Sequence, residues 1–154
     1  MTKKVHQQTR TDCGLACMAM AANLTYEEAY RHFDAVGLAT PRARKPAFAT
    51  NFTELRSALS QAGIPTRVRR YQSLAALPSR AILKVNVRPN GDWHWVFVER
   101  ENENILCVFD PARKGPSYTP IWVGERPEPL SRSAPWIPKG SYIEILSPDT
   151  GDSQ

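Results

Sequence analysis

The sequence has little cysteine, with three residues in 154, at positions 13, 17 and 107. An odd and low count excludes the disulfide framework of small secreted domains and is typical of a reducing compartment. Cys13 and Cys17 are about one helical turn apart, and no second pair of ligands follows at the spacing of a structural zinc site. We therefore expect no metal and no cofactor, which leaves the thiols for core packing or for nucleophilic chemistry.

Long apolar segments are also missing. No apolar run approaches the ~20 residues that span a bilayer, and the N-terminal MTKKVHQQT lacks the apolar stretch of a secretory signal. Hydrophobic residues make up 42% of the chain, which is enough for a core, and the length fits one domain. We expect a single cytoplasmic domain over residues 1–146 with no membrane partner, followed by a flexible tail over residues 147–154.

The net charge of +5 and the pI near 9.3 raise the hypothesis of a nucleic-acid partner. The clustered basic residues form only two short groups, which are not interleaved with aromatic residues and match no nucleic-acid motif. We predict that both groups are solvated surface and that nucleic acid is not a partner, with an acidic partner surface as the alternative. The groups are Arg42, Arg44 and Lys45, and Arg67, Arg69 and Arg70.

The first part of the chain predicts three helices. Residues 13–22 are rich in Ala, Met, Leu and Cys, which favour a helix, and Asp12 is a good N-cap. A second helix over 26–33 follows a capping box made by Thr25 and Glu28. A third opens at Thr53 and ends at a glycine, residue 63.

The second part predicts strands separated by turns, the clearest of which has Asn-Gly at its centre. The segment after residue 110 is a loop followed by a Pro- and Trp-rich stretch. Helices that precede an antiparallel meander indicate an α+β fold in which an N-terminal helical part packs on the sheet. The expected strands cover residues 66–71, 81–87, 93–99, 105–110 and 141–146.

A cysteine stands at the start of the first helix, in the stretch QQTRTDCGLACMAMAA. A thiol with its ordinary pKa near 8.5 is mostly protonated at neutral pH, and the thiolate is the nucleophile. The unpaired N–H groups and the dipole of a helix start favour the thiolate, and an imidazole partner would favour it further and take the proton. Cys13 is therefore either a nucleophile or a small buried residue.

The chain has three histidines that could supply this imidazole, His6, His32 and His94. His32 belongs to the polar part of the second helix, and His6 in the N-terminal arm stays open as a candidate. His94 lies near the start of a strand, and strand alternation places it on the sheet face opposite its two tryptophan neighbours. We take His94 as the candidate base, with a structural histidine as the alternative.

Two more side chains complete a candidate site. Asp110 ends the strand that follows His94, so a hairpin would bring both to one end of the sheet, where Asp110 could orient the imidazole. Gln7 lies six residues before Cys13, and its amide could donate to an oxyanion beside the Cys13 backbone N–H. Asp110 as a turn residue and Gln7 as polar surface are the alternatives, and the combination in this order carries the hypothesis.

These residues resemble the C39 peptidase family, a group of papain-like cysteine peptidase domains best known from bacterial transporters that export leader-bearing peptides. The resemblance covers residues 5–115 and is carried by QQTRTDCGLACMAM, NFTELRSALSQAGI, LPSRAILKVNV, HWVFVE and VFDPARKG. It implies a papain-like fold, Cys13 as nucleophile, His94 as base, Asp110 as the residue that orients it, and Gln7 as oxyanion donor.

Three features depart from the family pattern. No transmembrane or nucleotide-binding region follows, so we expect a stand-alone domain and not a transporter. The loop over residues 37–50 is basic and contains proline, and the Pro- and Trp-rich C-terminal segment is extra. Cleavage after a double-glycine leader is therefore not assumed.

The leading functional hypothesis is a cysteine peptidase that hydrolyses a bond in a peptide or protein substrate. A second is a module that recognises a peptide without cutting it. A third is a deamidase or isopeptidase, because the same thiolate and oxyanion site would serve those reactions.

Overall fold

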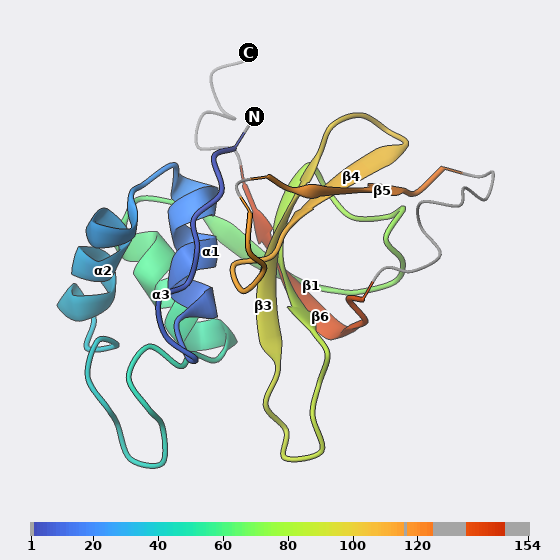
Figure 1. Ribbon diagram of the computed structural model, residues 1–154. Coiled ribbons are helices and arrows are strands. Elements are labelled where there is room, and N and C mark those ends of the chain that lie inside the picture. Colours follow the sequence, from blue (N-terminus) through green and yellow to red (C-terminus); the bar gives the residue numbers. More distant parts are fainter. Residues whose placement is uncertain (1, 116, 125–134, 147–154) are drawn as a thin grey trace.

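The computed structural model describes residues 2–115, 117–124 and 135–146, so the expected tail over 147–154 lies outside the described residues. The helices form one layer and the strands form the other (Figure 1). The helices are α1 Cys13–Ala22, α2 Tyr26–Ala35 and α3 Phe52–Gln61. The strands are β1 Thr66–Arg70, β2 Arg80–Val85, β3 His94–Arg100, β4 Ile105–Phe109, β5 Thr119–Trp122 and β6 Pro138–Ile145.

The six strands form one antiparallel sheet in the order β1-β6-β2-β3-β4-β5. Strands β2 to β5 are a meander, and β6 inserts between β1 and β2. The predicted α+β layout is confirmed, with a helical layer on an antiparallel sheet. Strand β5 was not predicted, because Pro120 lies inside it; β5 is at the sheet edge, where the missing N–H of a proline is tolerated.

The helix starts follow their caps, with one correction. The capping box of Thr25 and Glu28 is present at the start of α2. The prediction that Thr53 opens the third helix is wrong: Asn51 is the N-cap, and its side chain accepts a hydrogen bond of 2.8 Å from the Glu54 N–H. The Glu54 carboxylate bonds back to the Asn51 N–H, so the reciprocal pair fixes the start two residues earlier.

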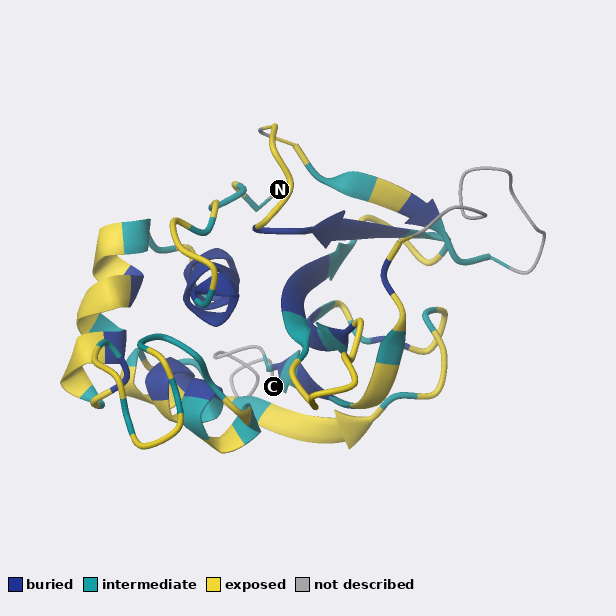
Figure 2. Cartoon of the chain, turned by 60° about the horizontal axis from the view of Figure 1, so that its bottom comes forward, coloured by how far each residue is buried: buried dark blue, intermediate teal, exposed yellow. Residues whose placement is uncertain are grey.

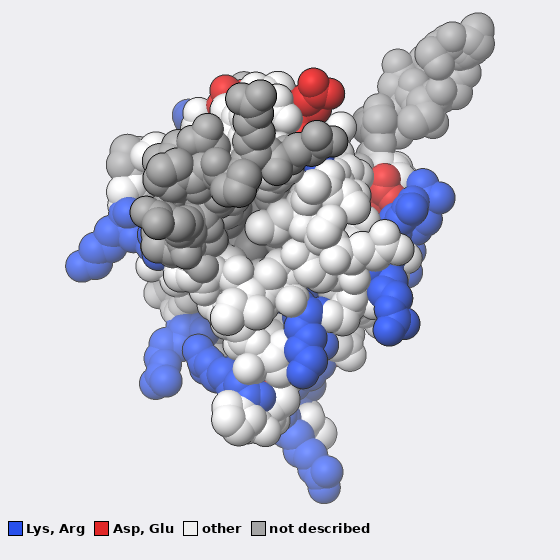
Figure 3. Space-filling model, turned by 90° about the vertical axis from the view of Figure 1, so that its right-hand side faces the viewer, with Lys and Arg blue, Asp and Glu red and all other residues white. Residues whose placement is uncertain are grey.

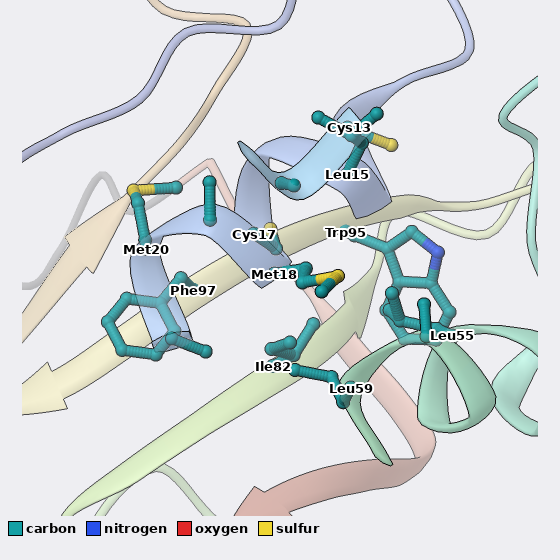
Figure 4. Packing of buried hydrophobic residues seen from close by; sticks show 14 of the residues in the cluster. Cys13, Leu15, Cys17, Met18, Met20, Leu55, Leu59, Ile82, Trp95 and Phe97 are labelled. Carbon is teal, nitrogen blue, oxygen red and sulfur yellow. The ribbon is translucent and has the colours of Figure 1, made fainter. Parts of the chain in front are cut away.

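Helix α1 is the most buried element of the fold. All of its residues except Ala22 are buried, and the helix lies between α2 and the sheet, with α3 beside it (Figure 2). On β3 the side chains alternate as predicted: Trp95 and Phe97 belong to the core beneath the helices (Figure 4), whereas Val96 and Val98 belong to a second core on the other face. The sheet therefore has two apolar faces, and the start of β3 lies where α1 begins.

The two basic groups are each balanced in part by one glutamate. Arg42 and Lys45 lie 3.3 and 2.6 Å from the Glu54 carboxylate. The Arg67 and Arg69 side chains each lie 3.4 Å from Glu144. On the face drawn in Figure 3 the Lys and Arg side chains are spread out and not gathered into one patch. An acidic partner surface stays a prediction.

Membrane crossing has no support in the described helices. Each of the three has ten residues, and none combines the length with the apolar character that a bilayer requires.

Candidate active site

Cys13 is the first residue of α1, and only 8% of its surface is exposed. The next residue must be very small, because a Cβ at Gly14 would lie 2.8 Å from Thr50 Oγ1 and 3.1 Å from Trp95 Cδ1. The glycine therefore lets the start of α1 pack closely against the start of α3 and against β3. Figure 4 shows Cys13 at the start of α1, with Trp95 nearby.

The structure brings His94 and Asp110 together. Phe97 on β3 pairs with Phe109 on β4, so the residues at this end of the hairpin meet. His94 Nε2 lies 2.7 Å from Asp110 Oδ1, and Asp110 Oδ1 also accepts a 2.9 Å bond from the Ala112 N–H. The Cys13 side chain also acts on His94, because it is among the groups that raise the pKa of the imidazole. Since Nε2 faces Asp110, the nitrogen available to the thiol is Nδ1.

The contacts shift the pKa values of both members of the pair. Burial alone would lower the pKa of His94, but hydrogen bonds with Asp110 and Cys13 raise it from 6.5 to about 9. Burial alone would raise the pKa of Asp110, but hydrogen bonds from His94, Trp136 and the Ala112 N–H lower it from 3.8 to about 2. At neutral pH the geometry therefore holds an imidazolium next to a carboxylate, and the Cys13 side chain acts on the same ring.

Gln7 lies on the segment that leads into α1, and it contacts the turn that follows Asp110. Its backbone N–H donates to the Pro111 carbonyl at 3.1 Å. Its side-chain Nε2 donates to the Thr9 carbonyl at 2.8 Å, while Oε1 is buried and has no hydrogen-bond partner among the described residues. An amide nitrogen carries two hydrogens, so one donor remains after the bond to Thr9.

Asp12 does a different task from the one predicted. It occupies the N-cap position of α1, but its side chain makes no capping bond. Instead the fully buried carboxylate accepts bonds from the Gln8 N–H at 2.9 Å, the Thr9 N–H at 3.0 Å and the Tyr26 hydroxyl at 2.6 Å. Asp12 therefore holds the loop that carries Gln7. Nothing in the sequence signals this contact of the Tyr26 hydroxyl.

A second contact that the sequence did not predict comes from Trp136, in the Pro- and Trp-rich segment. Its indole Nε1 donates to Asp110 Oδ2 at 2.8 Å, and 6% of the residue is exposed. The two residues are 26 positions apart, and no motif links them. The only feature of the sequence that could have pointed to this contact is the position of a tryptophan shortly before the last strand.

The remaining cysteines and histidines have other surroundings. Cys17 and Cys107 are fully buried, and burial raises the pKa of both thiols. His32 contacts Gln61 between α2 and α3, and His6 is exposed in the N-terminal arm. Within the described ranges no three His, Cys, Asp or Glu side chains cluster as metal ligands would.

A helix that begins with a nearly buried cysteine, set against an antiparallel sheet that delivers a histidine–carboxylate pair, is the architecture of the papain-like cysteine peptidases. The model of the Peptidase C39 family matches residues 1–120. The chain belongs to this family and is a cysteine peptidase, a hydrolase of peptide bonds.

The fold is also similar to solved structures. The peptidase domain of Streptococcus ComA, described as a bifunctional ABC transporter of a quorum sensing pathway, has a TM-score of 0.65 at 20% identity, covering 95% of this chain and 98% of that one. The peptidase domain of Streptococcus mutans ComA scores 0.58 at 19% identity, covering 94% and 99%.

A double glycine motif protease from an AMS/PCAT transporter, solved in complex with the leader peptide, scores 0.59 at 15% identity, with coverage of 94% of this chain and 91% of that one. At these identities the likeness shows the fold. A comparison with curated proteins gave no match.

Proposed function

We propose that this peptidase works through Cys13, His94, Asp110 and Gln7. The Cys13 thiolate is the nucleophile, and the His94 imidazolium is its counter-ion and the acid that later protonates the leaving group. Asp110 orients the imidazole through Nε2 and keeps it charged. The hydrogen bonds that raise the pKa of His94 to about 9 support this assignment, because they favour the ion pair over the neutral pair at neutral pH.

In the first half of the reaction the Cys13 sulfur attacks the carbonyl carbon of the substrate, and the carbonyl oxygen becomes an oxyanion. The second hydrogen of the Gln7 Nε2 and the Cys13 backbone N–H are the proposed donors, since the first N–H groups of a helix have no partner within it. The bond to Thr9 supports this role for Gln7, because it fixes the amide before the substrate arrives.

In the second half the tetrahedral intermediate collapses and the carbon–nitrogen bond breaks. His94 gives its proton to the departing amine, which leaves an acyl group on Cys13. Neutral His94 then takes a proton from water, and the hydroxide attacks the acyl carbon. The carboxylic acid departs, and the thiolate and imidazolium are restored.

The proposed substrate is a peptide segment in an extended conformation, because the nucleophile is almost buried and a folded surface could not reach it. The similarity to a double glycine motif protease makes a leader with two consecutive glycines the first sequence to test.

The observation that carries the proposal is the 2.7 Å contact of His94 with Asp110, together with the action of the Cys13 side chain on the same imidazole. It is tested with iodoacetamide at neutral pH and peptide mapping of the modified protein. We expect rapid labelling of Cys13 in the native protein and none in Cys13→Ala, with Cys17→Ala as the matched control one turn along α1. Label on Cys17 or Cys107 instead would remove the basis of the proposal.

A second assay separates the reaction types. The protein and Cys13→Ala are incubated with synthetic peptides that do or do not contain a Gly-Gly pair, and the products are weighed by mass spectrometry. Two fragments whose masses sum to the peptide plus one water indicate hydrolysis. A gain of about one dalton in an intact backbone would indicate a deamidase, and binding without any product would indicate a recognition module.

A further inference from the structure

Trp136 occupies a defined place beside the proposed site, although it lies outside the part of the chain that the family model matches, residues 1–120. Its ring belongs to the second core, on the face of the sheet away from the helices. From there the indole N–H reaches Asp110 Oδ2 at 2.8 Å. The two carboxylate oxygens therefore have different partners: Oδ1 is bound by His94 and Oδ2 by Trp136.

The position of this tryptophan is fixed by its neighbours. The next residue exchanges two hydrogen bonds with Asn86 after β2: the Ile137 N–H donates to Asn86 Oδ1 at 2.8 Å, and the Asn86 N–H donates to the Ile137 carbonyl at 3.0 Å. On the exposed side, the guanidinium carbon of Arg113 lies 4.9 Å from the centre of the indole. The bonds with Asn86 fix the backbone beside Trp136, and a rotation of the ring would break its contacts with Arg113 and Asp110.

The hydrogen bond from Trp136 matters because the Asp110 carboxylate can rotate about its Cβ–Cγ bond. Asp110 Oδ1 has two donors, from His94 and from the Ala112 N–H, whereas the one described partner of Oδ2 is the Trp136 indole. Without that donor, Oδ2 would have no hydrogen bond from the described residues, and rotation toward another donor would tilt Oδ1 away from the imidazole. A supporting bond of this kind orients the group that contacts the reacting atoms.

We propose that Trp136 is a positioning residue: through its indole N–H it fixes Asp110, and through Asp110 it holds His94 where the imidazolium keeps Cys13 ionised. This inference rests on the proposed function. It assigns part of the catalytic geometry to a segment outside the family match, and it gives the Pro- and Trp-rich segment a task.

The test removes the N–H and keeps the packing. Trp136→Phe is the simple variant, and replacement of Trp136 by β-(3-benzothienyl)alanine keeps both rings and substitutes sulfur for the N–H. Trp122→Phe is the matched control, because Trp122 on β5 pairs with Ile105 at the opposite end of β4 from Asp110. Thermal unfolding of each variant is recorded alongside.

The readout is the rate of Cys13 alkylation by iodoacetamide at pH 6 divided by the rate at pH 10. A loss of access or packing lowers both rates and leaves the ratio unchanged. A loss of the ion pair lowers the rate at pH 6 alone. We expect both Trp136 variants to reduce the ratio roughly 10- to 150-fold, as the loss of a hydrogen bond to a charged group would, and Trp122→Phe to leave it unchanged.

A ratio within twofold of the native value in the benzothienyl variant would overturn the inference, and it decides the matter even where Trp136→Phe does not fold. An equal loss in Trp122→Phe would overturn it too, since the effect would then not depend on the contact with Asp110. Both outcomes leave the proposed function standing as long as Cys13 takes the label. Labelling of another cysteine in place of Cys13 in the native protein would instead contradict the proposed function itself.

Discussion

The charge on His94 at neutral pH is the most direct quantitative consequence of the site. A pKa raised from 6.5 to about 9 corresponds to about 2.5 units, or about 3 kcal/mol in favour of the imidazolium at 1.36 kcal/mol per unit. The hydrogen bonds that raise it come from Asp110 and Cys13. The variant Asp110→Asn keeps an oxygen that can accept from Nε2 and removes the negative charge. We expect the pKa of His94 to fall by about 1–3 units in this variant.

The assay is a titration of the imidazole carbon-bound protons by NMR. The chain has three histidines, so three resonances are followed between pH 5 and 10, and His94→Ala identifies the one of interest. Asp92→Asn is the matched control: Asp92 lies two residues before His94 on the exposed turn, and its carboxylate accepts from Asn90. Cys13→Ala in the same titration measures the share that comes from the thiolate.

The sign of the effect on stability follows from the same shift. Because the folded pKa of His94 lies above the unfolded value, its contribution is fully present below pH 6.5 and is lost as the pH rises through about 9. The urea midpoint of the native protein should therefore fall over this interval more than that of His94→Ala does. A His94 resonance that titrates near 6.5 in the native protein, or one that Asp110→Asn leaves in place, would refute the reasoning.

Two further predictions concern the scaffold. Phe97→Ala empties a fully buried position on β3 beneath the helices, and we expect it to lower the free energy of unfolding by about 3–5 kcal/mol in urea titrations, whereas truncation of the exposed Ile137 should change it little. Asp12→Asn places an NH₂ group among donors from Gln8, Thr9 and Tyr26, so it should cost about 1–3 kcal/mol. It should also slow peptide hydrolysis by loosening the loop of Gln7, while an unchanged rate would show that Asp12 acts only on stability.

The local elements could be predicted from the sequence where one short segment contains the whole signal. The composition of α1 and the capping box of Thr25 and Glu28 each lie within a few residues, and both predictions agree with the structure. The start of α3 was misplaced because Asn51 and Thr53 both cap helices well, and only the reciprocal bond with Glu54 distinguishes them. Edge strand β5 was missed because Pro120 argues against a strand wherever the edge position is unknown.

The candidate site divides along a similar line. Cys13, His94 and Asp110 were proposed because each lies at or next to the end of an element, Gln7 was proposed because of its spacing from Cys13, and the order of the four along the chain resembles a known family. The contact of Asp12 with Tyr26 depends on the packing of α1 on α2. The contact of Asp110 with Trp136 depends on the insertion of β6 between β1 and β2. Neither arrangement leaves a periodic or local trace, so no reading of spacing could have found these partners.

The turn after β4 explains how two layers can hold one site. The N-terminal arm crosses the end of the sheet before it enters α1, and it is fixed there by backbone and side-chain bonds: Lys4 Nζ to the Arg113 carbonyl at 2.9 Å and the Gln7 N–H to the Pro111 carbonyl at 3.1 Å. The same turn contains Asp110, which contacts His94. The proposed oxyanion donor and the residue that orients the base are therefore attached to one short segment.

This attachment has a mechanical consequence. Motion of the helical layer against the sheet would change the distance from Cys13 to His94, but the arm couples α1 to the turn of Asp110, so the three groups are expected to move together. The Asp12 carboxylate also links the end of the arm that leads into α1 to helix α2, because it accepts a hydrogen bond from the Tyr26 hydroxyl. The position of Cys13 relative to His94 thus depends on residues 4–12 as well as on α1. For this reason we expect a weaker loop at Asp12 to slow peptide hydrolysis, although Asp12 contacts none of the reacting atoms.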